Sequence, residues 1–209
     1  MIFLNQPEKF IKEQVEKRFV NANISPELSS LLQEFMRDPE SFDNERFDIF
    51  SLEEIFTYLK ASHHYYLDHW IPKIENTLLQ MHSKYGGEFW SVKLLTLFIH
   101  SYKKELVEHI QQEELVLFSF VEKLLQGKQC EGHQDLVLNH FIHTHNDNVV
   151  IQLEALRKDI LLFDEDLKGN LMFEVLFNQL TVFQRDLMVH GLIEDHVFIE
   201  KLLLYVNSK

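Results

Sequence analysis

Cysteine, glycine and proline are all scarce in this chain of 209 residues, and long apolar runs are absent. The single cysteine, Cys130, can form neither an internal disulfide nor a thiolate cage around a metal, which favours a reducing, cytoplasmic setting. Six glycines and four prolines leave few positions that would break a helix. No apolar run approaches the roughly 18 residues of a membrane-spanning helix, and no signal peptide is expected.

Basic residues are also few, with 20 Lys and Arg against 33 Asp and Glu and a formal net charge of −13. General binding to nucleic acid or to an anionic membrane surface needs a basic surface. We therefore expect neither nucleic acid nor membrane among the partners.

Long stretches rich in Leu, Glu, Lys, Gln and Phe predict an all-α protein. Residues 1–50 are expected to form a short helical N-terminal extension and linker, with Ser25-Pro26 opening its second helix through about residue 36. A capping box of Ser51 and Glu54 is expected to begin the main domain, residues 51–209. Short connections there predict an up-down-up-down four-helix bundle. The four helices are expected at about 51–84, 88–126, 133–160 and 170–206.

Two segments, His109–Glu113 and His190–Glu194, repeat one pattern: a histidine with a glutamate four positions later. On a helix this spacing places both side chains on one face, one turn apart. Both pairs interrupt apolar rows where leucine would be expected, so the periodicity predicts that they are buried. A single such pair is usually a surface pair or a satisfied core histidine. Two buried pairs indicate a shared centre.

The positions of the candidate histidines along their helices bring them to one level. With a rise of about 1.5 Å per residue, His109, His145 and His190 lie at matching distances from the connecting turns. The first long helix offers His63 and His64 at the same level, and periodicity does not separate these two. The prediction is therefore four histidines, one from each helix, together with Glu113 and Glu194.

Imidazole and carboxylate ligands without thiolate suit iron or manganese better than structural zinc. Six protein ligands serve two metal ions when both glutamates bridge, with an oxo or hydroxo group completing the bridge. The residues therefore predict a pair of metal ions, iron or manganese, and the resemblance given next implies two iron ions. Such ions keep open positions for a small molecule, which the resemblance given next implies is a diatomic ligand, oxygen or nitric oxide.

These residues resemble the hemerythrin-like (HHE) domain, and within it the di-iron proteins that repair iron–sulfur centres. The similarity covers about residues 55–204. The family's first-helix ligand lies eight residues before a proline, which implies His64 here because Pro72 follows it, with His63 as the alternative. The ligand set that the resemblance implies is His64, His109, Glu113, His145, His190 and Glu194. The segments that carry it are His63-His64-Tyr65-Tyr66 with Ile71-Pro72, His109–Phe118, His145-Asn146-Asp147 and Asp186–Phe198.

The resemblance implies repair of iron–sulfur clusters damaged by nitrosative or oxidative stress, with the protein as an iron donor and damaged iron–sulfur proteins as partners. Repair proteins commonly carry an N-terminal cysteine pair, and residues 1–50 contain no cysteine. Three alternatives stay open: a carrier or sensor of oxygen or nitric oxide, a catalyst that reduces peroxide or nitric oxide, and a metal-free helical interaction protein. Whether the protein is an enzyme is left open.

Overall fold

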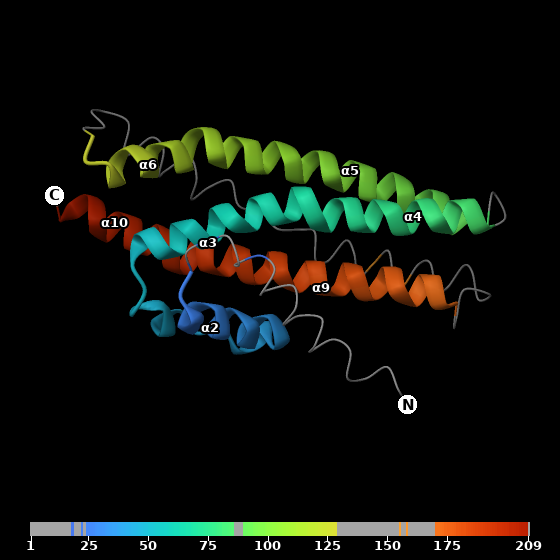
Figure 1. The fold of residues 1–209 in the computed structure, drawn as a ribbon, viewed down its shortest axis with the longest axis horizontal. Coiled ribbons are helices and arrows are strands. Elements are labelled where there is room, and N and C mark those ends of the chain that lie inside the picture. The colour runs from blue at the N-terminus through green and yellow to red at the C-terminus, as the bar shows by residue number, and fades with distance from the viewer. Residues whose placement is uncertain are drawn as a thin grey trace. The chain divides into compact units, whose positions relative to one another are not determined.

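The structure, a computed structural model, describes Arg18, Ala22, residues 24–85, 90–128, Ala155, Lys158 and 170–208. Every regular element among these residues is a helix, so the prediction of an all-α protein is confirmed for this part of the chain (Figure 1). The third predicted helix, about 133–160, lies outside the described residues apart from Ala155 and Lys158. The bundle arrangement therefore stays a prediction. Among the described helices, none is long and apolar enough to cross a membrane.

The chain divides into two compact units, and each is built from separate stretches of sequence. The first contains Met1–Tyr65, Gln111–His145 and Arg185–Lys209, and the second contains Tyr66–Ile110 and Asn146–Gln184. Neither unit is bounded at residue 50, so the predicted division into 1–50 and 51–209 stays a prediction.

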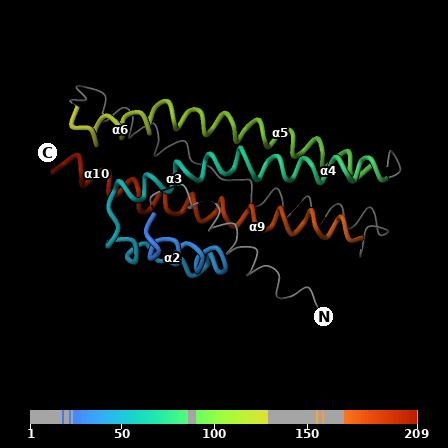
Figure 2. The backbone as a smooth tube through the Cα atoms, in the orientation of Figure 1, coloured from blue at the N-terminus to red at the C-terminus, as the bar shows by residue number. Residues whose placement is uncertain are grey.

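In the first unit, helix α2 (Pro26–Arg37) begins where the sequence predicts. Ser25 accepts a hydrogen bond at its side chain from the backbone N–H of Leu28 at 3.2 Å, and Pro26 fills the first helical position. Two 3₁₀ turns follow, η1 (Pro39–Ser41) and η2 (Asn44–Phe47), and the tube in Figure 2 shows these tight turns before the chain enters α3.

Helix α3 (Leu52–Tyr65) also has the predicted capping residue. The hydroxyl of Ser51 accepts the backbone N–H of Glu54 at 3.1 Å. The carboxylate of Glu54 accepts the backbone N–H of Ser25 instead of completing the capping box. This contact joins the start of α2 to the start of α3 within the unit that contains the candidate site.

In the described part of the chain, three π-helical turns interrupt the long helices, and sequence periodicity gives no sign of them. Turn η3 (Tyr66–Trp70) separates α3 from α4 (Ile71–Tyr85). Turn η4 (Glu114–Phe118) separates α5 (Trp90–Glu113) from α6 (Ser119–Leu125). Turn η6 (Glu194–Phe198) separates α9 (Leu171–Ile193) from α10 (Ile199–Asn207). Such turns are rare in proteins as a whole, and many of those that occur lie at functional sites.

The π turns change which residues face the core. Heptad spacing places Val116 inward, but its side chain is 46% exposed, and the neighbouring Leu117 is buried. A π turn takes more residues per turn than an α-helix, so the face beyond it is rotated. The prediction for Val116 is wrong for this reason.

The second unit has its own aromatic core. The ring of Phe183 packs against Trp70 at 5.5 Å and Tyr102 at 6.2 Å between centroids. Two buried polar side chains are hydrogen-bonded there: the Thr77 hydroxyl donates to the side-chain oxygen of Gln179 at 3.0 Å. The candidate site lies in the first unit.

Candidate metal centre

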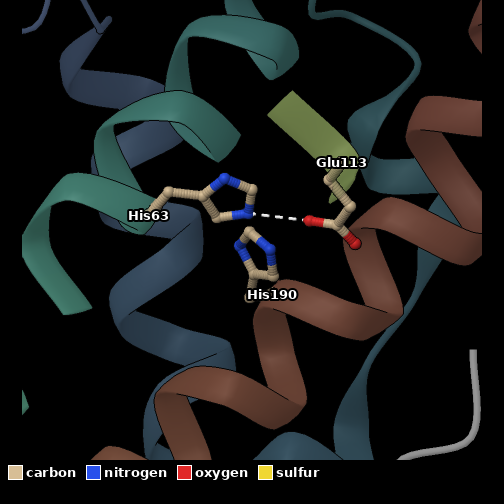
Figure 3. A group of neighbouring side chains, drawn as sticks. All are labelled: His63, Glu113 and His190. Carbon is tan, nitrogen blue, oxygen red and sulfur yellow. Dashed lines mark ion pairs between the residues drawn. The ribbon is translucent and has the colours of Figure 1, made fainter. Parts of the chain in front are cut away.

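Three buried side chains from three helices meet in the first unit. His63 comes from α3, Glu113 is the last residue of α5, and His190 comes from α9. One ligand atom from each lies within 4.8 Å of the others (Figure 3). All three are less than a tenth exposed. The burial of Glu113 and His190, which the sequence pattern predicts, is confirmed.

The spacing of these atoms suits a shared cation. Nε2 of His63 lies 3.0 Å from Oε2 of Glu113, and the rings of His63 and His190 have centroids 5.1 Å apart. Nitrogen and oxygen ligands lie about 2.0–2.2 Å from a zinc-sized ion, so two ligands of one ion are separated by at most about twice that distance. Neither ring nitrogen of His63 makes a hydrogen bond of good geometry within the described residues. The three groups could therefore hold one metal ion after a small adjustment of their side chains.

A second buried carboxylate lies beside this group. Glu194 is the first residue of η6, and its side chain has no exposed surface. Its Oε2 lies 3.5 Å from Nε2 of His190, one helical turn earlier. Two carboxylates in a protein interior are costly unless cations compensate them. A bound divalent metal would supply that compensation.

Phenylalanine side chains surround the site. The ring of Phe118 stacks on His63 with centroids 4.9 Å apart and planes 9° apart. Phe118 also packs edge-on against Phe56 at 5.0 Å and Phe198 at 6.2 Å. These apolar rings lower the local dielectric and strengthen any charge interaction within it. The phenylalanines named here pack in the core.

A buried ion pair that the sequence did not predict lies one turn before His190 on α9. The guanidinium of Arg18 pairs with the carboxylate of Asp186, and both side chains are buried. Arg18 also donates to the Ser62 hydroxyl at 3.2 Å and lies over the Tyr65 ring at 4.6 Å. The only sequence signal was the position of Asp186 four residues before His190, on the same helix face.

Two tyrosines beside this ion pair are held in the neutral form. Burial raises the pKa of Tyr58 well above its ordinary value, and it does the same for Tyr65. Arg18 opposes both shifts, while Asp186 adds to them. The ring of Tyr58 lies 6.2 Å from that of His190 between centroids, so an uncharged phenol borders the site.

On α3 the structure places His63 in the group and leaves His64 exposed. Consecutive residues of an α-helix point about 100° apart. The buried face of α3 passes through Leu59, Ser62 and His63, so the next residue turns outward. The described group therefore contains His63, the alternative that periodicity left open, and not His64. Which of the two binds a metal stays a prediction.

The remaining predicted ligands are not part of the described group. His109 is half-buried and belongs to the second unit, and His145 lies outside the described residues. The second iron ion therefore stays a prediction.

Comparisons of the chain with protein-family models, with curated proteins and with solved structures give no match.

Proposed function

We propose that this chain is a non-haem di-iron protein of the hemerythrin-like type, built as a four-helix bundle around the candidate metal centre. The observation that carries the proposal is the buried group of His63, Glu113 and His190. Glu194 is the fourth ligand in this proposal. His109 and His145 complete the set for the second ion.

The choice of iron rests on the ligand types and on the family resemblance. The group offers imidazole nitrogens and carboxylate oxygens and no thiolate, which suits iron and manganese. When bound, iron would supply a positive charge between the buried carboxylates and open positions for a small ligand. The chain's own residues would fix the ligand directions and exclude water through the rings around Phe118.

The proposed role is repair of iron–sulfur clusters damaged by nitrosative or oxidative stress, with this protein as the iron donor. The resemblance of the His-x3-Glu segments to repair proteins supports it. Metal analysis of the purified protein, joined to a visible spectrum of the oxidised form, tests the centre: about two irons per chain are expected. Restoration of a damaged cluster enzyme by the iron-loaded protein tests the role. A protein that is fully loaded but gives no restoration would refute donation and leave the centre intact.

The alternative is an oxygen or nitric oxide carrier or sensor. The absence of cysteine from residues 1–50 favours it, because the thiol chemistry common in repair proteins is missing there. Anaerobic ferrous protein titrated with nitric oxide separates the two roles. A saturable spectral change that reverses when the gas is removed supports the carrier. Loss of iron to an added chelator on the same treatment supports the donor.

A further inference from the structure

Two consecutive glutamates approach the two nitrogens of one imidazole. Nε2 of His63 lies 3.0 Å from Oε2 of Glu113, and Nδ1 lies 3.4 Å from Oε1 of Glu114. The Glu113 side chain is only 3% exposed, whereas that of Glu114 is 38% exposed. The two carboxylates therefore contact the same ring in different surroundings, one in the interior and one at the edge of the solvent.

The helix changes its geometry between these two residues. Neighbouring residues of a regular α-helix do not face a common partner. Glu113 ends α5, and Glu114 begins the π turn η4, so the regular phase of the helix stops between them. Phe118, the last residue of that turn, stacks on the same imidazole. The turn η4 thus contacts the imidazole of His63 twice. Phe118 packs on the face of the ring, and Glu114 lies at its Nδ1 edge.

A neutral imidazole binds a metal through one nitrogen only when its proton is on the other. Histidine ligands almost always donate that second N–H to a carboxylate, a carbonyl or water, which fixes the tautomer and the ring orientation. In metal-free protein, the close contact with Glu113 favours a proton on Nε2, the nitrogen that a metal would need. A carboxylate at Nδ1 favours the opposite tautomer.

We propose that Glu114 is a positioning residue for the metal centre: it accepts the Nδ1 proton of His63 and thereby keeps Nε2 available for the metal. The inference rests on the proposed function for the metal itself. The present separation of 3.4 Å is long for a hydrogen bond. Such contacts commonly tighten when a site is filled, and the half-exposed side chain of Glu114 has room to move.

The first test follows the tautomer of His63 by nitrogen-15 NMR in metal-free protein, at a pH where the ring is neutral. Glu114→Ala should lower the fraction with the proton on Nδ1, and Glu114→Asp should keep it near that of the wild type. Glu200→Gln, at an exposed glutamate of α10 in the same unit, is the control for loss of one negative charge. An unchanged tautomer fraction in Glu114→Ala would overturn the proposal.

The second test measures the affinity for ferrous iron without oxygen, by competition with a chromophoric chelator. Glu114→Ala should weaken binding about 10–100-fold, the usual effect of losing such a partner. Glu114→Asp should recover most of this loss, and Glu200→Gln should bind as the wild type does. Equal losses of iron affinity in Glu114→Ala and Glu200→Gln would show that the effect comes from the loss of any negative charge. That result would reject the positioning role of Glu114. A wild-type protein that binds no iron would reject the proposed function, and the tautomer measurement would still decide the role of Glu114.

Discussion

Oε2 of Glu113 lies 3.0 Å from Nε2 of His63, and both side chains are almost completely buried. This contact has two physical explanations. The pair is either a structural ion pair of the core or two ligands of a metal ion. The two explanations predict different effects of removing the carboxylate, so substitution of the glutamates separates them.

Replacing Glu113 or Glu194 by alanine should weaken metal binding. Each variant should bind ferrous iron at least about 10-fold more weakly, because a ligand is lost and the remaining imidazoles hold the ion less completely. Thermal unfolding with and without a chelator measures the coupling to stability. Metal at about 100 times its dissociation constant stabilises the native state by about 2.7 kcal/mol. The chelator should therefore lower the midpoint for the wild type and have little effect on the variants.

The opposite result would support a metal-free core. Two buried carboxylates without a cation destabilise a protein, so their removal would then raise stability. Variants that melt at higher temperature than the wild type, with or without added iron, would contradict the metal centre. Glu200→Gln serves again as the control for a change of surface charge.

His63→Ala and His64→Ala form a matched pair of adjacent substitutions. His63 is buried in the group, so its loss should abolish tight iron binding and leave a cavity beside Phe118. His64 is exposed, so its loss should leave iron content unchanged and alter the unfolding free energy by no more than about 0.5 kcal/mol. Metal analysis of the two purified variants is the measurement. Loss of iron in His64→Ala alone would return the first-helix ligand to the residue that the resemblance implies.

The sequence predicts the described helices well because their signals are local. Ser25 and Ser51 cap α2 and α3 as expected, and the long helices that the structure describes end within a few residues of the predicted positions. The burial of Glu113 and Glu194 is also predicted, because polar residues replace leucine in an apolar row. Periodicity carries this information without any knowledge of the tertiary structure.

The remaining features depend on contacts between distant segments or on irregular helix geometry. The choice between His63 and His64 requires the orientation of α3, since both lie at the same level along it. The exposure of Val116 follows from the π turn η4, which has no recognised sequence signal here. The pairing of Arg18 with Asp186 joins segments at opposite ends of the chain. All three features depend on how the helices pack or on irregular helix geometry, so the local sequence pattern does not predict them.

The exposed pair of Glu34 and Arg46 should make stability depend on pH in the acid range. Arg46 donates to both carboxylate oxygens of Glu34, at 2.6 and 2.9 Å, and this hydrogen bonding lowers the pKa of Glu34 below its ordinary value of 4.5. A pKa that is lower in the folded state contributes stability above the unfolded pKa, and that stability is lost as pH falls through the folded pKa. The difference in unfolding free energy between the wild type and Glu34→Gln should therefore narrow as pH falls below the ordinary pKa of 4.5. A gap of constant size between neutral and strongly acid pH would contradict this assignment.

The buried pair of Arg18 and Asp186 should be strongly coupled. Removing one partner leaves the other charge buried and uncompensated, which costs about 3–5 kcal/mol, whereas replacing both partners by apolar residues avoids that cost. Arg18→Met and Asp186→Leu should each destabilise the protein by about that amount in urea unfolding. The double variant should be much less destabilised than the sum of the two.

Additive effects in this double-mutant cycle would mean that the two side chains do not interact in the folded protein. The cycle also tests the place of Arg18 in the fold, because its side chain contacts the interior of the first unit. A large coupling energy would show that Arg18 belongs to the folded core beside the candidate metal centre, since Asp186 lies one turn from His190 on α9.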